Sequence, residues 1–280
     1  MKVGLVGSGL IGGSIVKAIA EAGVASEIAV YDKSAKHAAA VAEDIAEASV
    51  FENVEDMSTF AVILIATPVL SIAEYVDQLA SSNAVLIDAG SAKCSILKML
   101  EDNGGVPANY VPGHPLGGHT STGPGRSDPA IITGSPYLLT PVAQTDPKAV
   151  VTARSFLESI GADVRELDPV LHDRFFALAS HLPHLLSYAL VRSLEELPED
   201  DRDIVRELLP NSFRSLSAFA RSDPTMWRDI FSANRDDIQA ASERLYSSIE
   251  ALLADATQVG ASKLETELQK LRDLRRELDP

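Results

Sequence analysis

The sequence predicts an α/β fold, with a doubly wound parallel sheet followed by an all-helical domain, and three observations lead to this prediction. Short apolar runs alternate with helical patterns over residues 1–167. Continuous runs of this kind are typical of parallel strands that helices cover on both faces. After residue 168 no strand pattern follows, and apolar residues recur at helical spacing. A glycine-rich turn directly after the first run opens the first helix.

Each strand is expected where a short apolar run ends in turn residues. The expected strands are residues 3–6, 28–31, 62–66, 84–87, 137–139 and 164–167, and the helices expected in the second domain are 170–194, 201–220, 234–254 and 262–278. We place the domain boundary between residues 167 and 168. Ligands of doubly wound sheets bind at the carboxyl ends of the strands, so the residues after these runs are candidate site residues.

Composition limits the possible partners of this chain. It has 280 residues and a net charge of −16, from 24 basic and 40 acidic residues. This charge argues against nucleic acid or an anionic membrane as a partner. No apolar run approaches the roughly 20 residues that a membrane span requires. The single cysteine, Cys94, excludes an internal disulfide and fits a reducing, cytoplasmic location.

The glycine-rich turn has the spacing of a dinucleotide-binding motif of the Rossmann type. It consists of Gly7, Ser8, Gly9, Leu10, Ile11 and Gly12, and Asp32 ends the second strand 20 positions later. Such glycines let a pyrophosphate approach a helix N-terminus, and the acidic residue binds the ribose hydroxyls. Asp32 favours NAD over NADP because it would repel a 2′-phosphate, although Lys33 weakens that preference. Thr67 and Pro68 are expected along the cofactor, and ordinary turns that bind nothing are the alternative at both places.

Two polar clusters follow later strands, and one of them carries a candidate base. They read DAGSAK at residues 88–93 and GHPLGG at residues 113–118. A histidine at such a position can accept a hydroxyl proton while hydride leaves the same carbon. An isolated histidine is often structural, but five of the six histidines fall within residues 114–184. This clustering favours a catalytic role for His114.

Six stretches in the same order along the chain resemble the prephenate/arogenate dehydrogenase family of tyrosine biosynthesis. They are GSGLIGGS (7–14), DAGSAK (88–93), GHPLGG (113–118), LLTP (138–141), HDRFFALASHLPH (172–184) and SDPTMWRDIF (222–231). The resemblance implies an NAD-binding domain at 1–167 and a helical substrate and dimerisation domain at 168–280, forming a homodimer. It also implies oxidative decarboxylation of prephenate, arogenate or both, to 4-hydroxyphenylpyruvate or tyrosine. Hydride leaves the ring carbon that bears the hydroxyl, and the ring carboxylate leaves as carbon dioxide.

The resemblance also implies roles for particular residues. His114 takes up the proton of the ring hydroxyl, and Ser91 orients His114. Ser222 and Trp227 are assigned to the substrate, and Gly90 to the cofactor.

The stretch SHLPH, residues 180–184, interrupts an apolar helix with a proline, at a cost of about 3 kcal/mol. On the same resemblance, a kink at Pro183 opens the helix so that Ser180 and His184, one turn apart, reach the substrate. His181 is grouped with them, with packing or support as its favoured role. A kinked core helix is the alternative. A zinc site at His181 and His184 is disfavoured because no cysteine or acidic residue accompanies them at metal spacing.

The chain departs from the family pattern at three positions. Family members carry an arginine that grips the ring carboxylate, and here the aligned residue is Ala218. An acidic residue three positions earlier is replaced by Ser215, and a glutamate after the G-H-P motif is replaced within His119-Thr120-Ser121. Loss of the arginine removes a bidentate, charge-assisted grip on a carboxylate. The candidates to compensate are Arg214, Arg221, His119 and Arg126.

Two other functions remain open. A 3-hydroxyacid dehydrogenase with a similar domain pair would use a lysine in its helical domain, but no lysine lies between Lys148 and Lys263. A non-catalytic NAD-binding relative fits the lost arginine but has no need of His114. The last helix carries five leucines that fit either a subunit seam or packing on its own domain, namely Leu264, Leu268, Leu271, Leu274 and Leu278.

Overall fold

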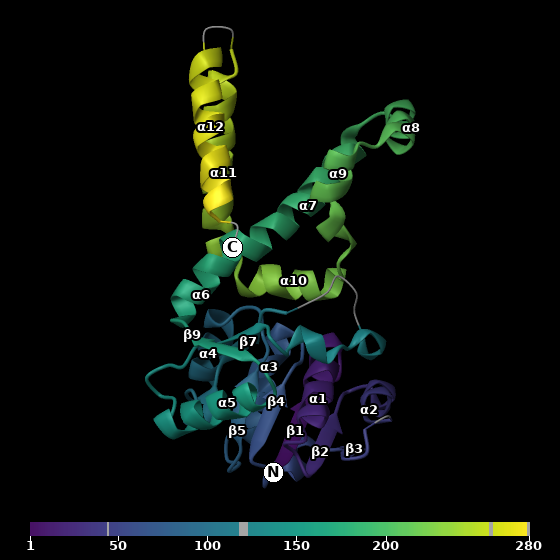
Figure 1. The fold of residues 1–280 in the computed structure, drawn as a ribbon, viewed down its shortest axis with the longest axis vertical. Helices are drawn as coiled ribbons and strands as arrows, with labels where there is room; N and C mark the ends of the chain where they lie inside the picture. Colours follow the sequence, from purple (N-terminus) through teal and green to yellow (C-terminus); the bar gives the residue numbers. More distant parts are fainter. Residues whose placement is uncertain (44, 118–122, 258–259, 279–280) are drawn as a thin grey trace. The chain divides into compact units, whose positions relative to one another are not determined.

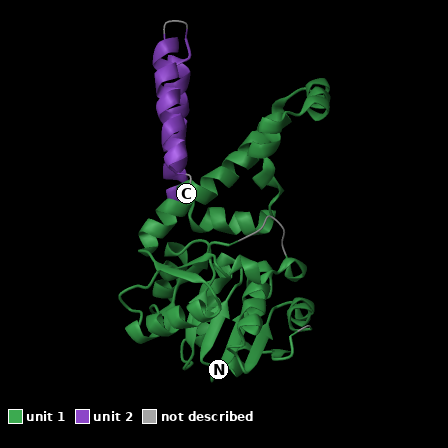
Figure 2. Cartoon of the chain, in the orientation of Figure 1, with its two compact units in different colours: residues 1–235 green, residues 236–280 purple. Residues whose placement is uncertain are grey.

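The computed structural model describes residues 1–43, 45–117, 123–257 and 260–278. The chain forms two compact units, residues 1–235 and residues 236–280 (Figure 2). The domain boundary expected between residues 167 and 168 falls inside the first unit. All residues of the candidate site that are described below belong to this first unit.

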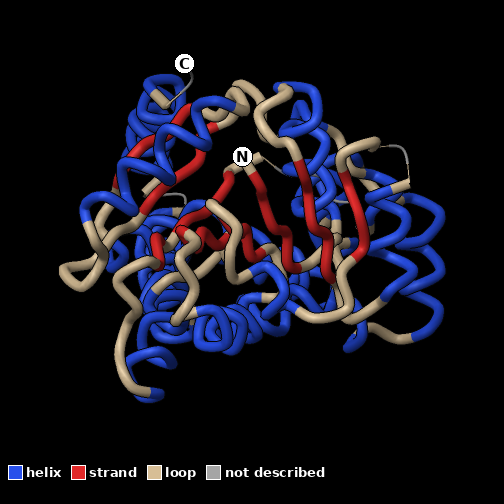
Figure 3. The backbone as a smooth tube through the Cα atoms, turned by 90° about the horizontal axis from the view of Figure 1, so that it is seen from below, coloured by secondary structure: helices blue, strands red, loops and turns tan. Residues whose placement is uncertain are grey.

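A six-stranded parallel sheet forms the centre of the first unit, and its order is β3-β2-β1-β4-β5-β6 (Figure 3). The strands are β1 (Lys2–Val6), β2 (Glu27–Tyr31), β3 (Ala48–Val50), β4 (Val62–Ile65), β5 (Val85–Asp88) and β6 (Tyr110–Val111). The first four expected strands are therefore confirmed. The strand order reverses between β1 and β4, and a crevice that can hold a ligand forms at such a switch point.

Helices cover both faces of this sheet (Figure 1), and alternate strand residues point to opposite faces. The helices are α1 (Leu10–Ala22), α2 (Ala35–Ala42), α3 (Ile72–Leu79), α4 (Cys94–Asn103) and α5 (Pro147–Ser159). Leu5 of β1 and Leu64 of β4 pack in one core with Ile15. Val6 and Ile65, the next residues along the same strands, pack in a second core. Burial on both faces explains why the strands read as continuous apolar runs.

The last two expected strands lie outside this sheet. They are β8 (Pro136–Leu139) and β9 (Asp163–Glu166), which pair in parallel, and β7 (Gly113–Pro115) pairs antiparallel with β8. These three strands form a second sheet. The strands β3, β6 and β7 were not expected because runs of two or three residues give no periodic signal. His114 lies in β7 and so has a fixed backbone.

The helical part of the first unit starts at Pro169. It contains α6 (Pro169–Phe176), a π-helical turn (Ala177–His181), α7 (Leu182–Arg192), α8 (Glu199–Leu208), α9 (Asn211–Leu216), the 3₁₀ turn Ala218–Arg221 and α10 (Pro224–Ala233). The helix expected at 201–220 is wrong as a single helix, since it breaks at Leu209 and Pro210. Proline removes a helical hydrogen bond and restricts the residue before it, which accounts for this break.

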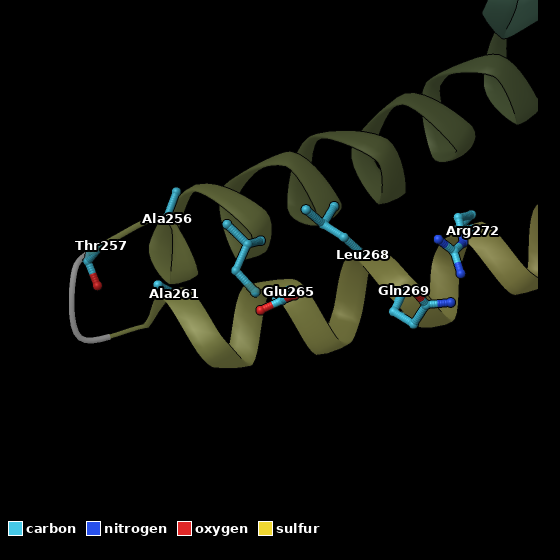
Figure 4. Close-up of a pocket in the computed structure, with 8 residues that line it drawn as sticks. Ala256, Thr257, Ala261, Glu265, Leu268, Gln269 and Arg272 are labelled. Carbon is cyan, nitrogen blue, oxygen red and sulfur yellow. The ribbon is translucent and has the colours of Figure 1, made fainter.

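The second unit is a pair of helices, α11 (Arg235–Asp255) and α12 (Ala261–Glu277). Its residues line a cavity of about 730 Å³ at one end of the pair (Figure 4). None of the expected site residues lines this cavity. Four leucines of the last helix are exposed within the chain, namely Leu268, Leu271, Leu274 and Leu278. Among the described residues, no helix is long and apolar enough to cross a membrane.

A buried ion pair lies at the carboxyl end of β5. Asp88 and Lys93 are both fully buried, and Lys93 Nζ lies 2.5 Å from Asp88 Oδ2. The other oxygen, Oδ1, accepts hydrogen bonds from Tyr110 Oη at 2.9 Å and Gly113 N at 2.7 Å. Burial raises the pKa of Tyr110 well above its ordinary value, so this phenol stays protonated and donates. The pair therefore ties the end of β5 to the segment that carries His114.

We predict that Asp88→Ala lowers the free energy of unfolding by about 3–5 kcal/mol, because it leaves the buried ammonium of Lys93 without its partner. Tyr137→Phe is the matched control, since Tyr137 only donates one hydrogen bond to the Asp88 carbonyl. It should cost about 1 kcal/mol. Urea denaturation measures both values, and equal losses would contradict the prediction.

Candidate functional site

The first part of the site is a crevice at the switch point of the sheet. Its volume is about 350 Å³, and it is lined by Gly7, Gly9, Tyr31, Asp32, Lys33, His37, Ala66, Thr67, Pro68, Ser71 and Tyr75. Five of the residues expected to bind the cofactor are in this set. Thr67 Oγ1 is buried without a hydrogen-bond partner among the described residues, so it is available to a ligand.

The glycine turn is shaped by two close backbone approaches. Gly7 has a φ of 94°, and a Cβ there would lie 2.6 Å from the Ala66 carbonyl oxygen. A Cβ on Gly12 would lie 1.9 Å from the Gly7 carbonyl oxygen. Gly9 differs, because a Cβ there meets nothing within 4 Å. Gly7 and Gly12 are therefore required by the fold, whereas Gly9 leaves space for a ligand.

The start of α1 offers backbone donors to this space. The helix begins at Leu10 after Gly9, which provides no side-chain cap. The first N–H groups of an α-helix have no partner within the helix, and the helix dipole favours an anion there. The N–H groups of Leu10, Ile11 and Gly12 are thus suited to the pyrophosphate of a dinucleotide.

Asp32 lines the crevice and is held by hydrogen bonds from Ser8 and Ser34. Its Oδ2 accepts from Ser8 N at 2.8 Å and Ser8 Oγ at 2.9 Å, and its Oδ1 accepts from Ser34 N at 2.8 Å. These bonds fix the carboxylate at the end of β2 for ribose hydroxyls. The Nζ of Lys33 lies 3.7 Å from Glu74 Oε2. The same atom lies over the Tyr75 ring, 5.6 Å from the ring centroid. The charge of Lys33 is therefore partly neutralised by Glu74.

The second part of the site is a chain of hydrogen bonds that ends at His114. His114 Nδ1 lies 2.9 Å from His172 Nε2, and His172 Nδ1 lies 2.8 Å from Asp173 Oδ1. Asp173 also accepts from the backbone N–H groups of Lys93 and Cys94, both at 2.8 Å. His172 and Asp173 are fully buried, and both belong to α6. These hydrogen bonds therefore link β7 to α6 and to the start of α4.

The carboxylate fixes the direction of every hydrogen bond in this chain. Burial opposes ionisation of Asp173, but hydrogen bonds from His172, Cys94 and Lys93 outweigh it and lower its pKa. An ionised carboxylate only accepts, so His172 donates from Nδ1. Burial lowers the pKa of His172, which leaves its Nε2 as an acceptor. His114 therefore donates from Nδ1, and its Nε2 carries a lone pair.

This lone pair makes His114 a base. The pKa of His114 is well below its ordinary value. Burial is the largest cause, and smaller contributions come from the nearby His172, Lys93 and His181. The ring is neutral at pH 7 as a result. Among the described residues Nε2 has no hydrogen-bond partner, so it can accept a proton from a bound hydroxyl.

His172 is the hydrogen-bond partner of His114 Nδ1, and the orienting role expected of Ser91 stays a prediction. No hydrogen bond joins Ser91 to His114 within the described part of the chain, and His172 holds the nitrogen that would receive one. Gly90, which is expected at the cofactor, donates its N–H to Asp88 Oδ2 at 2.9 Å. A Cβ on Gly90 would lie 2.7 Å from Ile72 Cδ1. Its small size therefore serves the turn after β5.

His184 forms the third part of the site, in an aromatic stack. The centroid of its ring lies 3.5 Å from that of the Trp227 ring, and the two ring planes are nearly parallel, at 19°. The centroid of the Phe219 ring lies 4.3 Å away. His184 Nδ1 donates to the Ser180 carbonyl at 2.9 Å, because a carbonyl can only accept. Burial lowers its pKa, so its Nε2 is an acceptor as well. Trp227 Nε1 is buried without a partner in the described residues and can donate to a ligand.

Pro183 acts differently from the simple kink that was expected. The five residues before α7, Ala177–His181, form a π-helical turn, and Pro183 lies in the first turn of α7. The helix continues through this turn, because Leu182 N–H donates to the Ala177 carbonyl, and Pro183 has no N–H to donate. The turn leaves the Ser180 carbonyl in reach of the His184 ring. Such π turns are frequent at functional sites.

His181 lies inside the protein beside Asn234. Its ring is buried, and its Nδ1 lies 3.1 Å from Asn234 Nδ2. Asn234 also donates to the Asp173 carbonyl at 2.9 Å. Because the amide nitrogen donates, Nδ1 of His181 accepts and the ring is neutral. These contacts favour the supporting role for His181, and its grouping with the substrate-binding residues stays a prediction.

The two arginines near Ala218 lie in different environments. Arg214 of α9 donates from Nε to the Leu209 carbonyl at 3.2 Å. Arg221 ends the 3₁₀ turn that contains Ala218 and Phe219, and its side chain is exposed. A single helix was expected to carry both arginines and Ala218. Instead, Arg214 lies in α9, and Ala218 and Arg221 lie in the 3₁₀ turn that follows. His119 lies outside the described residues.

Ser222 is held by its neighbours. It is buried, and its carbonyl accepts from Tyr188 Oη at 3.0 Å. This bond joins the start of α10 to α7, and α10 carries Trp227.

Sequence reasoning missed the partners of the candidate base, His114. His172, Asp173, Asn234 and Phe219 all come from parts of the chain that contact one another only in the fold. One signal was present, because the adjacent pair His172-Asp173 lies inside a stretch that matches the family. Its role could not be read because His114 is 58 positions away.

Comparison with known proteins agrees with this architecture. A family model described as the prephenate dehydrogenase nucleotide-binding domain matches residues 15–166, and one described as the prephenate dehydrogenase dimerization domain matches residues 168–270. The chain is 30% identical to the cyclohexadienyl dehydrogenase of Zymomonas mobilis, over 96% of this chain and 94% of the relative. It is 29% identical to the prephenate dehydrogenase of Bacillus subtilis, over 97% of this chain and 74% of the relative.

A solved structure is similar over the full length. Prephenate dehydrogenase from Aquifex aeolicus, in complex with hydroxyphenyl propionate and NAD⁺, superposes with a TM-score of 0.89 at 28% identity. The match covers 100% of this chain and 98% of that one. These comparisons confirm the expected family, the fold class and NAD as the cofactor.

We predict that Gly9→Ala and Gly12→Ala fail in different ways. Gly9→Ala should keep its melting temperature and weaken NAD binding at least about tenfold, because a methyl group there occupies the space of the pyrophosphate. Gly12→Ala should lower the melting temperature, since its methyl group would collide with the Gly7 carbonyl. Thermal unfolding and NAD titration by fluorescence measure both effects. Loss of stability in Gly9→Ala would contradict the assignment.

We predict that acid destabilises the fold partly through His181. Burial lowers the pKa of His181 to about 4, against about 6.5 when unfolded. The unfolded chain therefore binds a proton that the folded chain rejects, and stability falls as the pH drops from about 6.5 towards 4. The loss is about 3 kcal/mol by this linkage. Urea denaturation at pH 7 and pH 5 should show a smaller difference for His181→Gln, and an unchanged difference would contradict the prediction.

Proposed function

Because the chain belongs to the prephenate dehydrogenase family, we propose that it catalyses NAD-dependent oxidative decarboxylation of prephenate, arogenate or both. One observation carries the proposal, namely the hydrogen-bond chain that leaves Nε2 of His114 as an acceptor with no partner among the described residues. Oxidation of a ring alcohol requires such an acceptor for the hydroxyl proton. The products are 4-hydroxyphenylpyruvate from prephenate and tyrosine from arogenate.

In the proposed reaction His114 handles the proton of the ring hydroxyl. Nε2 accepts a hydrogen bond from the hydroxyl and takes its proton as the C–H bond on the same carbon breaks. NAD, when bound, supplies the hydride acceptor. The bond to the ring carboxylate then breaks to release carbon dioxide, its electron pair makes the ring aromatic, and His114 returns the proton to the phenolic oxygen. The positive charge that His114 gains is stabilised through His172 by Asp173.

The helical part of the first unit is proposed to hold the rest of the substrate. His184 Nε2 accepts and Trp227 Nε1 donates, and both groups lie in one stack. Ser180 is one turn before His184, and its carbonyl fixes the tautomer of that ring. We propose Arg221 as the group that replaces the family arginine, because it follows Phe219 in the turn that stacks on His184. Arg214 is less suited, since its guanidinium is bonded to Leu209.

We further propose the domain roles, assembly and location that the sequence led us to expect. Residues 1–167 bind NAD, and residues 168–280 bind substrate and form a homodimer, for which the dimerization-domain match and the exposed leucines of α12 are the support. The single cysteine supports a reducing compartment such as the cytoplasm. Sedimentation equilibrium tests the dimer.

The test of the function is NADH formation at 340 nm with each substrate, first with NAD and then with NADP. Wild-type protein should turn over at least one substrate with NAD, and the ratio of kcat/KM values gives the preference. His114→Gln should lose at least about 10³-fold in kcat, within the range of a lost general base. Absence of turnover in a wild-type protein that binds NAD would refute the proposal.

We predict that Arg221→Ala raises KM at least about tenfold, because the substrate carboxylate loses a charge-assisted hydrogen bond. Arg214→Ala is the matched control, and its KM should stay within about twofold, since its guanidinium is already bonded to a backbone carbonyl. Steady-state kinetics with the preferred substrate measures both variants. An unchanged KM in Arg221→Ala would show that another group holds the carboxylate.

A further inference from the structure

We propose that Lys93 is a positioning residue that fixes both the place and the tautomer of His114. This inference rests on the proposed function for its consequence in catalysis, but its geometry and one of its tests do not. Neither the matching stretch DAGSAK nor the expected site roles gave this lysine a function.

The side chain of Lys93 fixes the residue directly before His114. Its Nζ donates to the Gly113 carbonyl and to Asp88 Oδ2, each at 2.5 Å. Asp88 Oδ1 in turn accepts from Gly113 N at 2.7 Å. Both backbone polar groups of Gly113 are thus bonded to one buried ion pair. A Cβ on Gly113 would lie 2.9 Å from the Asp88 carbonyl oxygen, so this approach requires glycine.

The backbone of Lys93 fixes the other end of the chain of hydrogen bonds. Its N–H donates to Asp173 Oδ1 at 2.8 Å, beside the N–H of Cys94, which donates to Oδ2 at 2.8 Å. Asp173 sets the tautomer of His172, and His172 sets that of His114. One residue therefore holds the segment that carries the base and the carboxylate that orients it.

Lys93 also acts on the base through its charge. The charged and titratable groups that face His114 are His172 and Asp173 of α6, His181 of the π-helical turn, and the pair of Asp88 and Lys93. Apart from burial, the nearby His172 and then Lys93 lower the pKa of His114, and Lys93 is the cation of the two. Removal of the ammonium should therefore make His114 easier to protonate.

The experiment compares wild-type protein with the double variant Asp88→Asn/Lys93→Met, which removes both charges and so leaves no unpaired ion in the core. Tyr137→Phe is the control, because it removes one hydrogen bond to the Asp88 backbone carbonyl but keeps both charges and the ring that packs beside Gly113. Imidazole ¹⁵N NMR of NAD-bound protein follows the tautomer and protonation of His114 with pH. Steady-state kinetics follows kcat and the acid limb of kcat/KM.

Wild-type His114 should carry its proton on Nδ1, and in the double variant its protonation should move to higher pH. The acid limb of kcat/KM should move in the same direction, with a loss in kcat of about 10²-fold, as expected for a misplaced base. The control should leave all three readouts unchanged. NAD affinity should remain within about twofold in both variants, because the crevice residues are separate.

Three outcomes would overturn the inference. The first is a wild-type His114 with its proton on Nε2. This NMR measurement uses wild-type protein alone, so it decides even where the double variant does not fold. The second is a folded double variant whose His114 titrates as in the wild type. The third is a loss in kcat without any change in the pH profile, which would show a purely structural role. A wild-type protein inactive towards both substrates would refute the proposed function, and the NMR titration would still decide on Lys93.

Discussion

The buried carboxylate of Asp88 is the constraint on which the rest of the site depends. A buried charge is costly unless it is paired and hydrogen-bonded, so the chain must bring donors to the end of β5. Here Lys93, Tyr110, Gly90 and Gly113 all donate to it. Each of these donors fixes a different segment. Asp88 therefore holds together the turn after β5, the strand β6 and the start of β7. His114 is the residue after Gly113 in β7.

The parts of the site that depend on local sequence could be predicted, and those that depend on tertiary contacts could not. The glycine turn was predictable because Gly7 and Gly12 meet backbone atoms close in sequence or on the adjacent strand. The hydrogen bond from Ser8 to Asp32 follows from the pairing of β1 with β2. By contrast, the bond between His114 and His172 joins a strand to a helix 58 positions later, and no periodicity indicates it.

The fold itself shows the same division. The strands of the main sheet were predictable because burial on both faces produces apolar runs. The separate sheet of β7, β8 and β9 was not, since a strand's sequence does not say which sheet it joins. In the helical region the sequence does contain a signal for the break between α8 and α9. This signal is Pro210, which lies between the two helices. At Pro183 the sequence indicated an irregular helix, but not that a π-helical turn would absorb it.

The direction of the hydrogen-bond chain follows from a helix end. Asp173 accepts the N–H groups of Lys93 and Cys94 at the start of α4, where the helix dipole favours a negative charge. The hydrogen bond from His172, together with these two N–H groups, keeps the carboxylate ionised, and an ionised carboxylate can only accept. His172 must then donate to it, and His114 must donate to His172. Two neutral histidines in series could otherwise point either way, and only one direction leaves a lone pair on Nε2 of His114. The backbone N–H groups of Lys93 and Cys94 thus help to set the tautomer of His114.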